Sequence, residues 1–333
     1  MNLTTETWLI TVGLIIGLLL FDLLTSTRKA HDVSFKEATF WSVFYIAVAI
    51  IFGAWVWNEF GSQFGKEYFA AYIVEKSLSV DNLFVFLIIL TNFAVPSIYH
   101  QRVLMVGIVL ALIMRAIFIA LGAAALAAFS FTFVIFGAIL LWTGVKLFQH
   151  WDEDPDPSEN FIVKFAQRKF AFTNEFHGGK IFIRENGKRV ATPLLLVMLA
   201  IGATDLLFAL DSIPATFGVT QEPFLVFAAN AFALLGLRAL YFLIKNLVKK
   251  LIYLSMGLAF ILIFIGIKLV LVWAHEEWAS VPKISTNFSL AVIGSILLIS
   301  TIASLIKSKK DPTAIAHPGR MSDPKKKDPE KKK

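Results

Sequence analysis

The chain has 333 residues, of which 57% are hydrophobic and 17% charged, and its net charge is +7. A mean hydropathy of +0.71 is far above that of an ordinary soluble domain and excludes that class. The chain has no cysteine, which excludes disulfides, thiolate metal ligands and thiol redox chemistry.

Nine apolar segments are each long enough to cross a bilayer, which takes about 20 residues. They lie approximately at 7–24, 38–57, 69–92, 103–127, 131–149, 193–215, 223–244, 252–274 and 286–306. The N-terminus lacks the basic residues of a cleavable signal peptide, so we expect the first span to be retained. The sequence therefore predicts an all-α polytopic membrane bundle of about nine transmembrane helices over residues 1–306.

The distribution of basic residues predicts the orientation of this bundle. With the N-terminus outside, the loops and tail on the cytoplasmic side hold 24 Lys or Arg, and the outer segments hold only Lys66 and Lys283. Because cytoplasmic loops carry an excess of Lys and Arg, this asymmetry predicts an N-out, C-in arrangement with an odd number of spans.

Two segments are predicted to lie outside the membrane. The long loop 150–192 begins with an acidic run at 152–156, and Asn186-Gly187 between alternating residues predicts a β-hairpin in it. The acidic run either is simply solvated or collects cations at the cytoplasmic mouth. The tail 307–333 has ten Lys or Arg and is predicted to be disordered and cytoplasmic, touching anionic lipid rather than nucleic acid.

Two similar motifs place carboxylates inside apolar spans. In each, two acids stand six residues apart and a small polar residue follows the second acid. The motif residues are Glu75, Asp81 and Asn82 in the third span, and Asp205, Asp211 and Ser212 in the sixth. A charged side chain at the bilayer centre costs about 2.5–3.5 kcal/mol on insertion scales. The motifs therefore indicate a path for a cation.

Further matches follow the acids in the same order. Residues 112–118 resemble 235–241, and residues 139–147 resemble 261–269, so that an arginine and then a Gly-x-Lys recur. The sequence thus predicts a repeat of three spans, about 69–149 and about 193–274. A unit with an odd number of spans inverts its second copy, and inverted repeats are frequent in transporters that bind substrate at the midplane.

Residues six apart lie about 120° around a helix and roughly 9 Å along it, so the two acids of one straight helix cannot hold one ion together. Either the backbone unwinds, for example near Pro214, or each acid works with the other half. Oxygen groups near the acids are predicted to support the ion: Ser77, Ser79, Asn82, Thr204 and Ser212. The predicted counter-charges are Lys76, Arg115, Lys146, Arg238 and Lys268. A simpler alternative is that these acids and bases only pair to permit insertion.

The available ligands narrow the substrate. All six histidines fall in loops or at span ends, so the buried ligands are oxygens, which suit Mg²⁺, Ca²⁺ and Mn²⁺. Protons could exchange against such an ion. Anion transport is disfavoured by the acidic motifs, although the bases keep it open. No P-loop, nucleophile elbow or histidine metal centre is present, so we expect neither an enzyme nor a resident cofactor.

On the motifs at 75–82 and 203–214 and the loop at 184–193, the chain resembles the TerC family of integral membrane proteins, in particular its Alx-like branch, which is related to LysE-type exporters. The resemblance covers roughly residues 5–308. It implies export of Mn²⁺ across the bacterial inner membrane, with Glu75, Asp81, Asp205 and Asp211 as metal ligands. The alternatives are a non-transporting scaffold for other membrane proteins in tellurite or stress resistance, and an exporter of another ion such as Ca²⁺ or an oxyanion.

Overall fold

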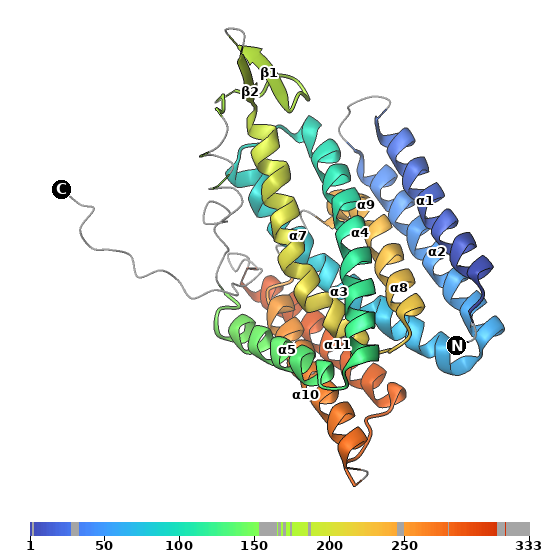
Figure 1. The fold of residues 1–333 in the computed structure, drawn as a ribbon. Coiled ribbons are helices and arrows are strands. Elements are labelled where there is room, and N and C mark those ends of the chain that lie inside the picture. The colour runs from blue at the N-terminus through green and yellow to red at the C-terminus, as the bar shows by residue number, and fades with distance from the viewer. Residues whose placement is uncertain are drawn as a thin grey trace.

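Figure 1 shows the computed structural model, which describes residues 1, 3–27, 33–152, 165, 168, 171–173, 175–185, 188–244, 250–278, 280–311 and 317. Within this part of the chain there are ten helices and two short strands. In chain order they are α1 (Thr5–Thr27), α2 (Phe35–Phe60), α3 (Ser62–Asn92), α4 (Ser97–Ala128), α5 (Thr132–Gln149), β1 (Phe182–Glu185), β2 (Lys188–Ala191), α7 (Pro193–Phe217), α8 (Pro223–Leu235), α9 (Leu237–Ile244), α10 (Leu254–Glu277) and α11 (Thr286–Lys310).

The predicted all-α polytopic bundle is confirmed. Each apolar segment of the sequence coincides with a helix or, for the seventh segment, with the bent pair formed by α8 and α9. Among the described residues, seven helices are long and apolar enough to cross a membrane, and the bent pair raises this number to eight. Helix α3 is 31 residues long but carries the charges of the first motif. The count of nine spans and the orientation stay predictions.

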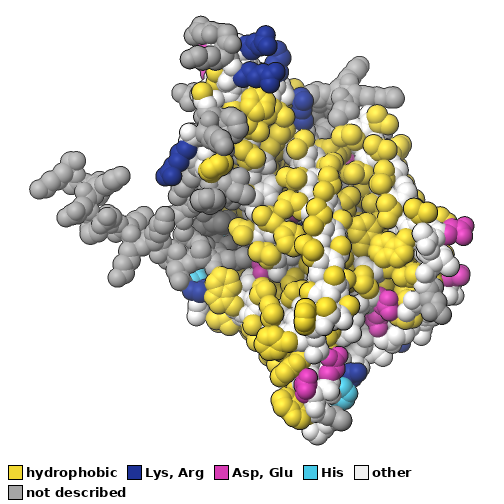
Figure 2. Space-filling view, viewed as in Figure 1, with side chains coloured by type: hydrophobic (Ala, Val, Ile, Leu, Met, Phe, Trp, Pro, Cys, Tyr) yellow, Lys and Arg dark blue, Asp and Glu magenta, His cyan; other side chains and the backbone are white. Residues whose placement is uncertain are grey.

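The two ends of the bundle differ in charge. Strands β1 and β2 pair antiparallel, with Glu185 opposite Lys188, as the hairpin prediction requires, although the two turn residues lie outside the described residues. On the face in Figure 2, Lys and Arg gather around this hairpin, and Asp and Glu gather at the opposite end. The positive-inside rule expects such a separation across a membrane. The acidic run at 153–156 and most of the tail beyond Asp311 also lie outside the described residues.

Helices α5 and α10 cross in very close contact. A Cβ atom on Gly137 would lie 2.9 Å from the carbonyl oxygen of Gly266, and one on Gly144 would lie 3.0 Å from that of Ala259. Because residue numbers rise along α5 as they fall along α10, the two helices are antiparallel. Helix α3 packs on α8, and α4 packs likewise on α7. These pairs agree with the inverted repeat that the sequence predicts.

Helices α3 and α7 lie inside the bundle, where α4, α5, α8 and α10 pack against them. Both helices are continuous through their acidic motifs, and α7 continues past Pro214 to Phe217. The possible unwinding there does not occur. The break falls instead at Gly236, where the axes of α8 and α9 differ by 41°. Large apolar side chains cover the outer surface, as a lipid-facing bundle requires (Figure 2).

Candidate functional site

One cluster of buried charges joins the first acids of the two motifs. The guanidinium of Arg115 on α4 donates from Nη1 to Glu75 Oε2 at 2.8 Å and to Ser212 Oγ at 3.0 Å, and its Nη2 lies 3.5 Å from Asp205 Oδ1. Thr216 donates to the other oxygen of Glu75 at 3.0 Å. All these side chains are buried, so one arginine holds a carboxylate from each half of the molecule.

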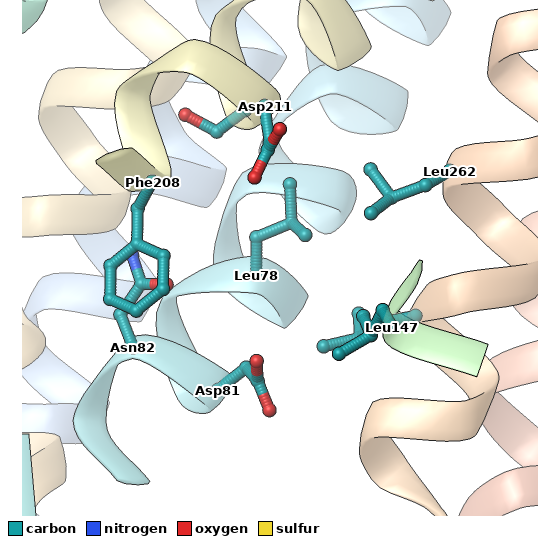
Figure 3. Close-up of a pocket in the computed structure, with 9 residues that line it drawn as sticks. Leu78, Asp81, Asn82, Leu147, Phe208, Asp211 and Leu262 are labelled. Atoms are coloured by element: carbon teal, nitrogen blue, oxygen red, sulfur yellow. The ribbon is translucent and has the colours of Figure 1, made fainter. Parts of the chain in front are cut away.

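The second acids of the motifs face a cavity beside this cluster. The cavity has a volume of about 20 Å³, enough for one water molecule or bare cation. Figure 3 shows Asp81 and Asp211 on opposite sides of Leu78, with Leu147 and Leu262 facing them. Its remaining lining consists of Asn82, Phe208, Ser212 and Leu258. Both halves of the molecule therefore contribute a carboxylate and a small polar residue to one space.

Hydroxyl groups from the crossing helices α5 and α10 contact these two acids. Thr143 on α5 donates to Asp211 Oδ1 at 2.8 Å, and Ser255 on α10 lies 3.1 Å from Asp81 Oδ1. Ser255 Oγ is also 2.7 Å from the carbonyl oxygen of His317, so its single proton is shared between two acceptors. Each acid thus has a neutral donor from the third helix of the opposite half, α5 for Asp211 and α10 for Asp81.

Charge at the site is not balanced within the described residues. Four buried carboxylates face one guanidinium, because the ion pairs of Arg115 reach only Glu75 and Asp205. No cation of that part of the chain pairs with Asp81 or Asp211. A buried carboxylate without a counter-charge is stabilised by taking up a proton or a metal ion. The cavity between these two acids is therefore a place for a positive charge.

The arrangement is not a finished metal centre. Among the residues that the structure describes, no three His, Cys, Asp or Glu side chains lie close enough together to hold a metal ion. Ca²⁺ or Mn²⁺ would need further oxygens from hydroxyls, amides, carbonyls or water. Three buried atoms of this region have no hydrogen-bond partner among the described residues: Ser79 Oγ, Asp205 Oδ2 and Asn82 Nδ2. The Asn82 nitrogen belongs to an amide whose oxygen is a ligand candidate.

The structure brings together only some of the predicted supporting residues. Ser79, Asn82 and Ser212 are buried in the region of the acids. Ser77 and Thr204, in contrast, donate to backbone carbonyls one turn earlier in their own helices, to Ile73 and Ala200. Hydroxyl groups in apolar helices commonly make this bond, and the support that these two residues would give an ion stays a prediction.

The predicted counter-charges also separate. Only Arg115 holds motif acids. Lys76 donates to the carbonyl oxygen of Ala233 at 3.2 Å, and Arg238 pairs with Asp22 of α1 at 2.6 Å. Lys268 lies towards the other end of α10, in a second cavity. Lys146 makes none of the described contacts with the acids, although it does have a partner of its own.

Sequence reasoning missed three hydroxyl residues of the site. Thr216 follows Ser212 by one helical turn, so extending the polar stripe of the sixth span would have found it. Thr143 and Ser255 are isolated polar residues in apolar helices, and nothing in their local sequence marks them. Their role arises only from the crossing of α5 and α10 over the motif helices.

Comparisons with known proteins agree with the motifs. The profile described as "Integral membrane protein TerC family" matches residues 60–312. An uncharacterised membrane protein of Myxococcus xanthus is 43% identical over 93% of this chain and 95% of its own length. One from Mycobacterium tuberculosis H37Rv is 45% identical over 89% of this chain and 78% of its own length.

A third relative carries a functional name. The Salmonella typhi protein Alx, named as a proposed membrane-bound redox modulator, is 36% identical over 86% of this chain and 91% of its own length. No solved structure matches. The match of the profile and the similarity to Alx fit the two motifs and the all-helical bundle described above. The chain belongs to the TerC family of integral membrane proteins, as an Alx-like member.

Proposed function

We propose that the protein exports a divalent cation, with Mn²⁺ as its main substrate, from the bacterial cytoplasm across the inner membrane. One observation carries this proposal: Asp81 and Asp211, contributed by the two halves of the bundle, face one small cavity without a cation paired to them in the described part of the chain. A structural ion pair would not leave two carboxylates in this state, since unpaired buried charge is costly. A transported cation supplies the missing charge.

The ligand set supports a hard divalent ion. The polar residues among the lining of the cavity offer carboxylate, hydroxyl and amide oxygens, and such donors suit Mn²⁺, Ca²⁺ and Mg²⁺ rather than Zn²⁺ or Cu²⁺. Mn²⁺ is placed first because of the exporter role that the family resemblance implies. Proton exchange follows from the same carboxylates: without the ion they are stabilised by protons, and binding a dication releases those protons.

The position of Arg115 bears on how an ion could reach the first acids of the two motifs. In the present arrangement its guanidinium occupies the space between Glu75 and Asp205 that a cation would otherwise fill. We propose that a bound ion shifts towards these two acids only when the arginine moves aside, so that ion and arginine alternate. Neither an enzymatic activity nor a resident cofactor is part of this proposal.

The test compares intracellular Mn in cells that lack the protein with Mn in cells that overproduce it. Overproduction should lower Mn, and Asp81→Asn and Asp211→Asn should abolish the effect while the protein still reaches the membrane. Asp311→Asn is the matched control, because this acid lies at the end of α11 and pairs with Lys307. In vesicles, an imposed pH gradient should drive Mn²⁺ flux in the direction opposite to the protons.

Other outcomes point to other functions. If intracellular Mn is the same with and without the protein, a membrane scaffold is favoured, with the hairpin region as its docking surface. A change in Ca rather than Mn would favour a different substrate. Redox modulation, the role in the name of the Salmonella relative, would need a bound cofactor here, because this chain has no cysteine for thiol chemistry.

A further inference from the structure

A second, larger cavity lies at the end of the bundle away from the β-hairpin. Its volume is about 310 Å³, which leaves room for several water molecules beside an ion. The first turns of α3, the segment after α7 and the second half of α10 enclose it. Its polar lining consists of Glu67, Thr220, Gln221, Glu222, Lys268, Lys283 and Thr286. We call it the outer cavity, since the predicted orientation places it outside.

A line of oxygens connects the outer cavity with the buried charge cluster. Thr220 donates to Glu67 Oε2 at 2.7 Å, and Thr216, one turn earlier, donates to Glu75 Oε1 at 3.0 Å. Ser212, Thr216 and Thr220 are spaced by four residues, and the backbone N–H of Thr220 donates to the Thr216 carbonyl at 3.0 Å. Their hydroxyls therefore follow one face of α7 and its extension. The hydroxyls of Thr216 and Thr220, one turn apart, thus contact the carboxylates of Glu75 and Glu67 respectively.

Lys268 faces Glu67 across this cavity. The lysine is only 6% exposed and interacts electrostatically with Glu67, yet it makes no hydrogen bond among the described residues. Glu67 has neutral partners besides Thr220, because Gln63 donates to its Oε1 at 2.6 Å. An ammonium that makes no hydrogen bond to the described residues is attracted to the carboxylate by its charge, and a second cation in the cavity can compete with it.

We propose that Glu67 and Thr220 form a release site for the divalent cation in the outer cavity, and that Lys268 competes with the cation for Glu67. This inference rests on the proposed export function. An ion that moves from Glu75 along the threonine hydroxyls reaches Glu67 and pushes the ammonium away. The returning ammonium then weakens the hold of Glu67 on the ion, which leaves to solution. Lys268 is thus a positioning residue that keeps the release site weak.

The experiment measures Mn²⁺ binding to the purified protein, from the electron paramagnetic resonance signal of free Mn²⁺, and net Mn²⁺ flux in proteoliposomes. Without its competitor, Lys268→Gln should bind Mn²⁺ at the outer cavity about 10-fold more tightly. Mn²⁺ on the outer side should then inhibit net export at about 10-fold lower concentration. Glu67→Gln should change both quantities in the opposite direction, and the double variant should resemble Glu67→Gln alone.

Two controls come from the same end of the molecule. Lys66→Gln and Glu59→Gln remove like charges that do not line the outer cavity, and both should bind and transport like the wild type. Lys268→Met, which suits an apolar helix, replaces Lys268→Gln if that chain does not fold. If the Lys268 and Glu67 variants bind Mn²⁺ and are inhibited like these controls, the release site is wrong. Mn²⁺ flux through the wild-type protein would in that case still support export. If the wild-type protein shows no Mn²⁺ flux but the variants change Mn²⁺ affinity as expected, export is wrong and the Mn²⁺ site at Glu67 still stands.

Discussion

Corresponding arginines in the two halves of the bundle have different partners. Arg115 in α4 lies between Glu75 and Asp205, whereas Arg238, its counterpart in α9, forms a buried pair with Asp22 of α1. Both hydrogen-bond to carboxylate oxygens at distances of 2.6–3.5 Å. The second half therefore keeps the arginine but uses it to attach a helix from outside the repeat.

The helices that carry these arginines differ as well. Residues 112–115 lie within α4, which runs without a break for 32 residues. The matching residues 235–238 contain Gly236 in place of Ile113, and there the span breaks into α8 and α9 with a bend of 41°. The bend and the changed partner occur within three residues of each other. Two similar segments thus differ in shape: the first is part of one continuous helix, and the second is bent at a glycine.

This difference determines the charge of the candidate site. Within the described part of the chain one guanidinium opposes the four motif carboxylates, because Arg238 pairs with Asp22 of α1. A symmetric placement would have added a second guanidinium and reduced the attraction for a cation. Loss of symmetry between the repeats is therefore part of what makes the centre acidic, and it can be tested one residue at a time.

The largest expected effect comes from removing the arginines. Arg115→Met and Arg238→Met each remove the arginine that pairs with buried carboxylates, and breaking a buried ion pair typically costs about 3–5 kcal/mol of stability. We expect similar falls in the melting temperature, followed by tryptophan fluorescence. Only Arg115→Met should also change Mn²⁺ affinity and reduce export by at least about 10-fold, since Arg238 lies with Asp22.

A double variant separates stability from function. Asp22→Asn with Arg238→Met removes both charges of the second pair, and replacing a whole buried pair is often neutral. The double variant should therefore recover most of the stability lost by Arg238→Met, with Mn²⁺ export close to that of the wild type. Loss of export in this well-folded chain would show that the two arginines are not functionally different.

The sequence predicted that the motif acids of the two halves lie together, but it did not predict the partners of the other buried charges. Charged residues in apolar spans are visible from composition alone, and their repetition indicated that the halves converge, as Glu75 and Asp205 do at Arg115. The partner of Arg238 was not predictable. Asp22 is 216 residues away, and only the packing of α1 against the second half brings the two together.

The break in the seventh span shows a second limit. Pro214 is the stronger local signal for a break, but α7 continues beyond it: proline removes only its own N–H bond, and the Gly218 N–H still donates to the Pro214 carbonyl at 2.9 Å. Gly236 lies inside the predicted seventh span, 223–244. A tertiary contact accompanies the bend: Lys76 donates to the carbonyl oxygen of Ala233, in the last turn of α8.

Removal of that lysine should have an intermediate effect. Carbonyls in the last turn of a helix lack helical partners, and a charged donor to one of them contributes about 1.5–3 kcal/mol. We expect Lys76→Met to lower the melting temperature accordingly, whereas Lys66→Met, in the first turns of the same helix, should change it little. If both variants melted alike, the bond to Ala233 would not stabilise the break in the seventh span.

The smallest effects are expected at the two corresponding positions Gly236 and Ile113. Gly236 has φ −84°, which alanine also adopts, and a Cβ there would lie 3.0 Å from Tyr45 Cβ and 3.4 Å from Lys76 Nζ. Alanine favours a continuous helix over glycine by about 1 kcal/mol. Gly236→Ala should therefore change stability by no more than about 1 kcal/mol but slow Mn²⁺ export several-fold if the bend changes during transport.

Ile113→Gly introduces the glycine into the unbroken helix. The isoleucine side chain is 55% exposed, so the main cost is helix propensity, again about 1 kcal/mol. Export should be unaffected, because α4 has no lysine donor at this position to stabilise a break. Equal export rates in both variants would mean that the bend is a fixed feature of the second half. Slower export in Gly236→Ala alone would make the bend a moving part, and the asymmetry of the halves would then extend from charge to motion.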